Sequence, residues 1–192
     1  VYAHGEEVQI SLTSRKLSWL LPRLYNNAAA IIANSRNTRT LLEQIGVHRE
    51  KIHLIHPGVN IAAFHVADGT PQYIRQNVPQ VKYLIVGSGE ALPHLQQLAY
   101  DLHVTERVIF ADRVPDSELA SYYAACDVFA MPNRQIGPDI EGFGMVYLEA
   151  GAAGKPVVGG KSGGTEDAII DQCTGFRVDG ANVEEIATAI TA

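Results

Sequence analysis

The sequence predicts an α/β protein built from βαβ units on a parallel sheet. Short apolar runs that suit buried strands alternate with segments of about ten residues whose apolar side chains recur at helical spacing. This alternation is typical of parallel strands joined by crossover helices. Ligands of such sheets bind beyond the carboxyl ends of the strands, and Gly87, Arg113, Pro132 and Gly160 fall at such ends.

Residues 1–56 contain the first expected elements. A leucine stripe predicts the first helix, Ser35 is a suitable N-cap for the second, and Gly46 would close that second helix. In chain order we expect a strand at 1–4, a helix at 14–26, an apolar run at 28–35, a helix at 36–44 and a strand at 52–56 that ends before Pro57.

The remainder of the chain continues the alternation without an internal repeat. The expected helices are at 71–78, 91–102, 116–125, 144–153, 165–170 and 182–190. The expected strands are at 81–87, 107–110, 127–131, 156–159 and 175–178.

Composition narrows the class of protein. A chain of 192 residues, 46% hydrophobic, can form one large or two small globular domains with a real core. The net charge of -6, with 15 scattered Lys and Arg, argues against nucleic acid as a partner. Cys126 and Cys173 form no disulfide framework, and no signal peptide or membrane-spanning run is recognisable. We therefore expect a cytoplasmic protein.

The segment 141–150, EGFGMVYLEA, carries the strongest functional signal. A helix that begins near Gly144 leaves its first amides without intrahelical acceptors, and the helix dipole adds positive charge at the same end. Such an end suits an anion, commonly a phosphate. Glu141 precedes the helix and Glu149 lies a little over one turn inside it, so one carboxylate can flank each side of the anion.

This segment resembles a family signature. Glu, seven residues and Glu, with Gly-Phe-Gly after the first Glu, is similar to the signature of the retaining glycosyltransferases of family 4, which have the two-domain GT-B architecture. Further blocks resemble the family in the expected order. They are residues 57–60, 83–90, 108–134, 151–169 and 174–180.

The resemblance implies a parallel-sheet, Rossmann-like domain of the GT-B type beside part of a second one. Residues 1–56 resemble only the C-terminal remnant of the N-terminal, acceptor domain. Residues 57–192 resemble the nucleotide-sugar (donor) domain, without its first strand and its Arg-Lys loop, which family members carry between the positions of Thr70 and Pro71. Relatives also continue beyond the position of Ala192, so we expect an incomplete copy.

Roles at the donor follow from the resemblance. Glu149 would accept hydrogen bonds from the ribose diol, and Glu141 would hold the hexose hydroxyls and act at the reacting sugar. Glycine at 87–89 would let the backbone approach the diphosphate closely. The complete donor set is Gly87, Ser88, Gly89, Arg113, Val114, Glu141, Phe143, Gly144, Met145, Val146 and Glu149.

The resemblance also places residues elsewhere in the cleft. Gly163 and Gly164 would border the acceptor side. His4 matches a position where relatives present a histidine near the sugar, so it is a second catalytic candidate, although a plain strand-end histidine explains it equally well.

The implied activity is transfer of a hexose from a nucleotide diphosphate sugar to an acceptor hydroxyl, with retention at the anomeric carbon. Neither a cofactor nor a metal is expected, because helix N-termini and basic side chains can carry the leaving diphosphate. GDP-mannose is the first donor choice, with UDP-glucose or UDP-GlcNAc next, and the acceptor would be a sugar, a lipid-linked sugar or a small molecule. The alternative is a catalytically inactive fragment that binds nucleotide sugar weakly or not at all.

The sequence matches several other known motifs only in part. Gly87 and Gly89 lack the third glycine of a dinucleotide fingerprint, because position 92 is Leu. Residues 160–164 satisfy Gly-x-Ser-x-Gly, yet a hydrolase of that kind needs a later histidine, and the last histidine is at 103. Position 155 is Lys where a P-loop needs glycine. His53 and His56 lack a third zinc ligand nearby, so packing accounts for them better.

A peripheral membrane contact, at the inner face of the membrane, is a further hypothesis. In residues 14–25 a leucine stripe lies beside basic and aromatic residues that suit a membrane interface. These residues are Leu17, Leu20, Leu21 and Leu24, then Arg15, Lys16 and Arg23, then Trp19 and Tyr25. An ordinary docking helix needs the same stripe, and we expect Pro22 to kink or end the helix.

Overall fold

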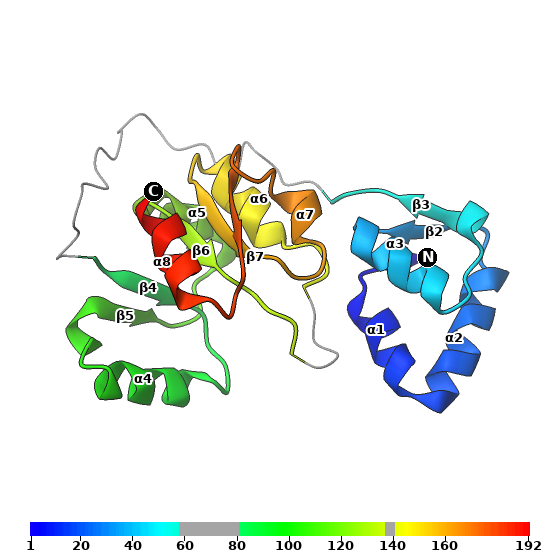
Figure 1. The fold of residues 1–192 in the computed structure, drawn as a ribbon, viewed down its shortest axis with the longest axis horizontal. Helices are drawn as coiled ribbons and strands as arrows, with labels where there is room; N and C mark the ends of the chain where they lie inside the picture. Colours follow the sequence, from blue (N-terminus) through cyan, green and yellow to red (C-terminus); the bar gives the residue numbers. More distant parts are fainter. Residues whose placement is uncertain (58–80, 137–140) are drawn as a thin grey trace.

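The computed structural model confirms the mixed α/β fold with parallel strands, and it describes residues 1–57, 81–136 and 141–192. Figure 1 shows two lobes. We call residues 1–57 the first lobe and the described residues from 81 to 192 the second lobe. The expected helix at 71–78 and the last three residues of the 57–60 block lie outside the described residues.

The first lobe is a three-stranded parallel sheet covered by helices. Its strands pair in the order β1-β2-β3, and a single core joins the sheet to the helices. The strands are β1 (Tyr2–Ala3), β2 (Ile31–Ala33) and β3 (Ile52–Leu54). The helices are α1 (Glu6–Thr13), α2 (Arg15–Asn27), α3 (Arg36–Gln44) and the 3-10 turn η1 (Arg49–Lys51).

The sequence analysis missed α1. This helix follows Gly5, whose φ of 105° starts the turn without a side-chain cap, so the usual N-terminal signal is missing. Tertiary packing supplies the stability instead, since Val8 and Ser11 are fully buried and α1 packs against α2 and α3. By contrast, Ser35 caps α3 as predicted, and its Oγ accepts from the Thr38 amide at 3.0 Å.

Pro22 does not end α2, contrary to one expected outcome. The helix continues through Pro22 to Asn27. Proline removes one intrahelical hydrogen bond. Leu21 and Tyr25, on either side of it, pack against the core of the first lobe, and this burial offsets the loss.

The second lobe holds two separate parallel sheets among its described strands. The larger has the order β6-β7-β8, with β6 (Phe129–Met131), β7 (Val157–Gly160) and β8 (Gly175–Val178). Its helices are α5 (Asp116–Ala125), α6 (Met145–Ala152), α7 (Thr165–Ala168) and α8 (Val183–Thr191). Helix α6 packs against β7 with α5 and α7 beside it, and α8 packs against β7 and β8. The core of this sheet consists of Tyr123, Tyr147, Ala150, Val157 and Ile169.

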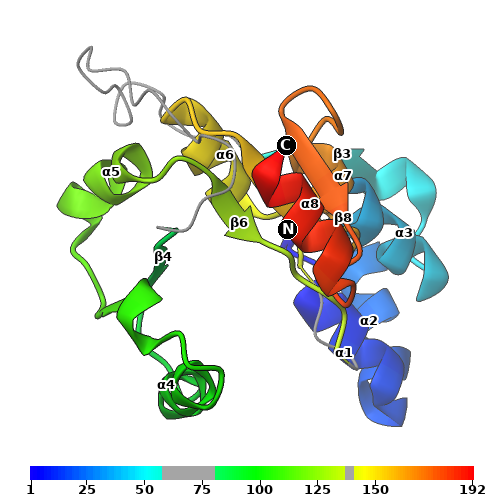
Figure 2. The same ribbon diagram turned by 60° about the vertical axis from the view of Figure 1, so that its left-hand side comes forward.

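The smaller sheet stands apart from the larger one, as Figure 2 shows. It consists of β4 (Tyr83–Val86) and β5 (Val108–Ala111), with α4 (Leu92–Asp101) and the 3-10 turn η3 (Thr105–Arg107) beside them. The expected parallel sheet is therefore divided in this lobe. The apolar residues of the β4–β5 unit are poorly covered. Ile109 is 50% exposed, and Ala99 is the one residue of α4 that is buried. The main packing contacts of this unit lie within it, between β4 and β5 and between η3 and both β5 and α4.

No helix in the described part of the chain is both long and apolar enough to cross a membrane.

Candidate functional site

A cavity of about 800 Å³ opens where the carboxyl ends of the two larger sheets meet. It lies beyond β1, β2 and β3 on one side and beyond β6 on the other. This is where ligands of parallel sheets bind. The lining residues are Tyr2, His4, Asn34, Ile55, His56, Pro57, Met131, Asn133, Arg134, Glu141, Gly142, Phe143, Gly144, Met145 and Val146.

On the first-lobe wall, hydrogen bonds hold His4 and Asn34 together. Asn34 Nδ2 donates to the His4 carbonyl oxygen at 3.3 Å, and the hydroxyl of the buried Thr38 lies 2.7 Å from Asn34 Oδ1. The second lobe meets this wall through Gly142, where a Cβ would overlap the His4 carbonyl oxygen. These contacts, rather than solvent, therefore fix the positions of the Asn34 side-chain amide and the His4 backbone.

On the second-lobe wall, the segment 141–144 leads into α6. Gly144 has a φ of 86°, and a Cβ there would overlap the Tyr147 ring, so position 144 favours glycine for two independent reasons. Helix α6 begins at the next residue, and its first amides have no intrahelical acceptors. The cavity wall therefore combines the Glu141 carboxylate with the positive end of a helix.

Behind this wall, Tyr147 links α6 to the end of β6. Its hydroxyl lies 2.7 Å from the Met131 carbonyl oxygen and 2.8 Å from Asn133 Oδ1. Asn133 Oδ1 also accepts from the Gly160 amide at 2.9 Å. Burial, and then the charge of Glu141, raises the pKa of the Tyr147 hydroxyl, so this group stays a neutral donor.

Glu149 lies on α6 but does not line the cavity. Its Oε2 accepts a 2.8 Å hydrogen bond from the hydroxyl of Tyr123, which is on α5. Burial, and then the hydrogen bond and charge of Glu149, raises the pKa of Tyr123.

Asp167 connects the two lobes beside the cavity. Its side chain has no exposed surface, and its Oδ2 accepts a 2.6 Å hydrogen bond from the Arg36 amide. Its Oδ1 lies 3.3 Å from Arg36 Nη1 and 3.5 Å from His56 Nε2. Both distances are within the range of an ion pair, but neither contact has the geometry of a hydrogen bond. The His56 ring in turn contacts Phe143, with the ring centroids 5.6 Å apart.

Some of the predicted site residues meet at the cavity. These are His4, Glu141, Phe143, Gly144, Met145 and Val146. Gly164 lies just outside, where its amide donates to the Glu141 carbonyl oxygen at 2.9 Å, and Gly163 precedes it. The roles assigned to all of them stay predictions.

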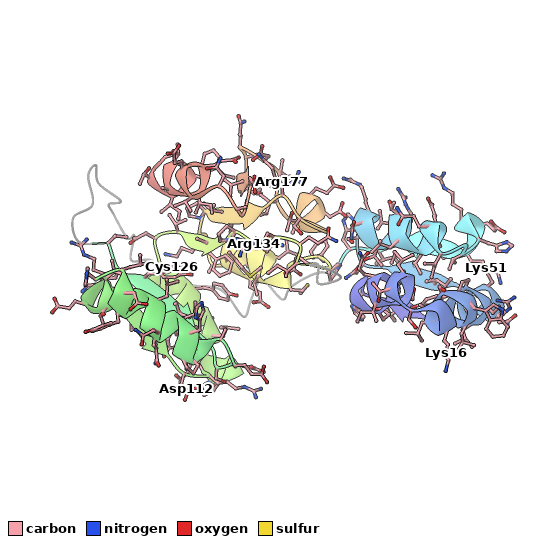
Figure 3. The ribbon with its side chains drawn as sticks, turned by 60° about the horizontal axis from the view of Figure 1, so that its bottom comes forward. Lys16, Lys51, Asp112, Cys126, Arg134 and Arg177 are labelled. Atoms are coloured by element: carbon pink, nitrogen blue, oxygen red, sulfur yellow. The ribbon has the colours of Figure 1, made fainter. Side chains whose placement is uncertain are left out.

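Apart from Glu149, the other predicted donor residues belong to the β4–β5 unit and do not line the cavity. They are Gly87, Ser88, Gly89, Arg113 and Val114. Figure 3 shows Asp112, the neighbour of Arg113, well separated from Arg134. Gly87 and Arg113 follow the ends of β4 and β5 as expected, and the Arg113 amide donates to Asp112 Oδ1 at 2.7 Å. In this arrangement the donor set is divided between two places.

Sequence reasoning missed several residues of the site. Asn34 follows β2 directly and Asn133 lies two residues beyond the end of β6, so a polar residue near the carboxyl end of a strand was the available signal. His56 lines the cavity in addition to packing against Phe143, which the packing interpretation alone did not predict. Among the described residues that line the cavity, Arg134 is the only Lys or Arg. Lys16 and Lys51 lie on the side of the first lobe that faces away from the second lobe, as Figure 3 shows. The described residues contain no group of three or more His, Cys, Asp or Glu that could hold a metal ion.

Comparison with known families assigns both lobes. The family of glycosyl transferases group 1 matches residues 71–192, and glycosyltransferase family 4 matches residues 1–63. The chain is 48% identical, over 61% of its length, to the GDP-mannose-dependent α-(1-6)-phosphatidylinositol monomannoside mannosyltransferase of Mycolicibacterium smegmatis, of which the match covers 31%. It is 30% identical, over 88% of its length, to the D-inositol 3-phosphate glycosyltransferase of Mycobacteroides abscessus, of which the match covers 45%.

Solved structures share the fold. The crystal structure of Anabaena HepE in complex with UDP-glucose superposes with a TM-score of 0.79 at 25% identity, covering 98% of this chain and 60% of that one. Sucrose-phosphate synthase from Thermosynechococcus elongatus shares the fold with a TM-score of 0.73 at 23% identity, covering 92% and 52%. The chain thus spans less than two thirds of the length of each of these proteins.

Proposed function

The chain belongs to the glycosyl transferases group 1, with the GT-B fold, and on that premise we propose that it moves a hexose from a nucleotide diphosphate sugar to an acceptor hydroxyl with retention at the anomeric carbon. In this proposal residues 1–56 supply the acceptor side, and residues 57–192 supply the donor side. The protein works in the cytoplasm, at the inner face of the membrane.

The observation that supports the proposal best is the cavity between the carboxyl ends of the two larger sheets. Its second-lobe wall offers the Glu141 carboxylate and the amino end of α6, and its first-lobe wall offers His4 and Asn34. A sugar needs hydrogen-bonding partners for its hydroxyl groups. A diphosphate needs positive charge beside it, in a site that excludes water. The two walls provide both kinds of group in one space.

The proposed reaction exchanges one bond at the anomeric carbon for another. The bond to the leaving diphosphate oxygen breaks, and the acceptor oxygen bonds to the same face. The nucleotide diphosphate departs with the electron pair of the broken bond, and one of its oxygens takes the acceptor proton because it lies on the side of attack. Glu141 holds the hexose hydroxyls and is not a nucleophile, whereas His4 lies against the reacting sugar.

Charge on the leaving group is carried by the protein in this proposal, so the transfer needs no metal. The α6 amino end places oriented dipoles at the cavity, and Arg134 adds a full positive charge to its lining. Pre-organised groups of this kind stabilise developing negative charge without reorganisation during the reaction.

GDP-mannose is the proposed donor, with a UDP sugar next. The relative that is 48% identical is named GDP-mannose-dependent, whereas HepE was crystallised with UDP-glucose. The acceptor is proposed to be a lipid-linked sugar, because the same relative is named for a phosphatidylinositol monomannoside.

One observation favours the alternative of an inactive nucleotide-sugar-binding fragment. Gly87–Gly89 and Arg113, proposed to hold the diphosphate and the base, lie in the β4–β5 unit rather than at the cavity. A donor set that is divided in this way loses charge-assisted hydrogen bonds, each worth about 1.5 to 3 kcal/mol.

Two measurements on the 192-residue chain test the proposal and separate it from the alternative. The first is isothermal titration with GDP and with UDP, in which we expect saturable binding of GDP. The second is product analysis after incubation with GDP-mannose or a UDP sugar and a mannosylated lipid acceptor, in which we expect an α-linked product. The absence of turnover supports the alternative whether or not nucleotide binds, and the absence of binding also contradicts the donor-site assignment.

A further inference from the structure

The hydrogen bond between Tyr123 and Glu149 joins two helices behind the α6 end of the site. The Tyr123 hydroxyl lies 2.8 Å from Glu149 Oε2. Tyr123 is 7% exposed, and its ring contacts Phe129, with the centroids 5.5 Å apart. The hydroxyl is therefore held in place by the core of the second lobe, whereas Glu149 is only partly buried.

Each partner has a fixed chemical role in this bond. The buried Tyr123 hydroxyl keeps its proton at neutral pH, so it can only donate to a carboxylate. An ionised carboxylate offers about four acceptor positions on its two oxygens. One bond from Tyr123 therefore orients Glu149 and leaves about three acceptor positions, enough for the two donors that a vicinal diol presents.

We propose that Tyr123 is a positioning residue for the nucleotide, which fixes Glu149 in the orientation that receives the two ribose hydroxyls. This inference rests on the proposed function, in which Glu149 binds the ribose. A glutamate side chain free in solvent must lose its rotamer freedom when a ligand binds, and pre-ordering it removes that cost. Tyr123 never touches the ligand in this account.

A structural account of the same contact makes a different prediction. If the Tyr123 hydroxyl only satisfies a polar group of the core, its removal lowers stability without changing which part of a nucleotide the protein recognises. If it positions Glu149, its removal weakens the contribution of the ribose hydroxyls alone. The ligand that separates the two accounts is a nucleotide that lacks those hydroxyls.

The test is titration of the parent chain and of Tyr123→Phe with GDP and with 2′,3′-dideoxy-GDP, or with the uridine pair if UDP binds more tightly. Phenylalanine keeps the ring that packs on Phe129. We expect Tyr123→Phe to bind GDP about three- to tenfold more weakly, the scale of immobilising one long side chain. Its affinity for the dideoxy nucleotide should equal that of the parent.

Tyr122→Phe is the matched control, because it removes a hydroxyl from the next residue of the same helix, and it should bind both nucleotides like the parent. Thermal unfolding without ligand shows whether Tyr123→Phe is folded at the temperature of titration. Equal weakening of both nucleotides by Tyr123→Phe, or no weakening of GDP, overturns the positioning role.

The variant Glu149→Ala distinguishes a wrong inference about Tyr123 from a wrong proposed function. If Glu149→Ala weakens GDP but not the dideoxy nucleotide while Tyr123→Phe changes neither, the ribose site stands and the inference about Tyr123 is wrong. If Glu149→Ala does not distinguish the two nucleotides, or if the parent binds neither GDP nor UDP, the assignment of Glu149 fails and the inference fails with it.

Discussion

Asp167 Oδ2 accepts a 2.6 Å hydrogen bond from the backbone amide of Arg36, although the two residues are 131 positions apart in the chain. The donor is the first residue of α3 in the first lobe, and the acceptor is on α7 in the second lobe. Because an amide at the start of a helix has no intrahelical acceptor, a carboxylate from the other lobe satisfies it and also complements the helix dipole.

We expect Asp167→Ala to lower the free energy of unfolding by about 1.5 to 3 kcal/mol, the range for hydrogen bonds to a charged group. Urea denaturation followed by circular dichroism measures this change. Arg36→Ala should cost less than about 1 kcal/mol, because the backbone donor remains and the lost side chain is 56% exposed. The exposed Glu166→Ala is the control. A larger loss for Arg36→Ala than for Asp167→Ala would contradict the importance of the backbone contact.

Glycine at position 164 permits close contact between the lobes. A Cβ there would overlap the Gly142 carbonyl oxygen and lie 2.8 Å from Ser35 Cβ. We expect Gly164→Ala to destabilise the protein by about 1 to 3 kcal/mol, the usual cost of overpacking. Thermal unfolding provides the measurement.

Gly151→Ala is the matched control for this prediction. Gly151 lies within α6 with open space around its Cβ position, so alanine should stabilise the helix by about 0.5 to 1 kcal/mol. If Gly164→Ala were also stabilising, the tight packing at the lobe contact would be disproved.

The Tyr147 hydroxyl connects the start of α6 to the end of β6. Tyr147→Phe keeps the ring but removes the donor to Met131 and Asn133, so we expect a loss of about 0.5 to 1.5 kcal/mol in chemical denaturation. Tyr100→Phe removes an exposed hydroxyl from α4 and should be neutral. Equal effects of the two variants would show that the Tyr147 network contributes nothing specific.

The two carboxylates of the 141–150 segment should differ in their effects. We expect Glu149→Ala to weaken nucleotide binding by about 1.5 to 3 kcal/mol, because it removes a charged acceptor. Glu141→Ala should act mainly on turnover, because Glu141 is proposed to hold the transferred sugar. Calorimetry and initial rates measure the two quantities, and parent-like behaviour of both variants would refute the site assignment.

Helix α2 exposes apolar side chains that suit a membrane surface. Trp19 is 60% exposed and Leu24 is 55% exposed, whereas Leu21 packs inward. The Arg23 guanidinium lies 4.1 Å from the centre of the Trp19 ring. We expect the chain to sediment with vesicles of anionic lipid at low salt and to be released by moderate salt, since each basic residue contributes about 1 kcal/mol at such a surface.

Trp19→Ser with Leu24→Ser should greatly reduce this sedimentation, because it removes the two most exposed apolar side chains of α2 and leaves the charges in place. Tyr100→Ser, which removes an exposed aromatic residue from the other lobe, is the control. A parent chain that stays in the supernatant at both salt concentrations would exclude an interfacial role for α2.

The sequence predicted elements best where local signals were strong. Helix α5 and strand β8 have the predicted bounds. Helix α5 begins after a proline and has acidic residues in its first turn, and β8 is a short apolar strand. Helix α1 carries no cap and was missed. The division of β4 and β5 from the larger sheet also could not be predicted, because alternation of strands and helices fixes their type but not which strands pair.

At the site, the segment 141–146 could be predicted because its signature is contiguous. The partners that hold it could not. His56, Asn133 and Asp167 reach the site from separate elements, and no spacing in the sequence connects them. Whether Gly87 or Arg113 contributes depends on the placement of the β4–β5 unit, which is a tertiary property.

The strand order has a consequence for how the chain acquires its structure during synthesis. Every pairing between the described strands joins strands that follow one another directly, as in β1-β2-β3 and β6-β7-β8. The entropy lost on closing such a connection grows slowly with its length, and local pairings fold faster than distant ones. Each parallel pair can therefore form soon after its second strand leaves the ribosome, and no described strand has to wait, unpaired and prone to aggregation, for a partner from the far end of the chain.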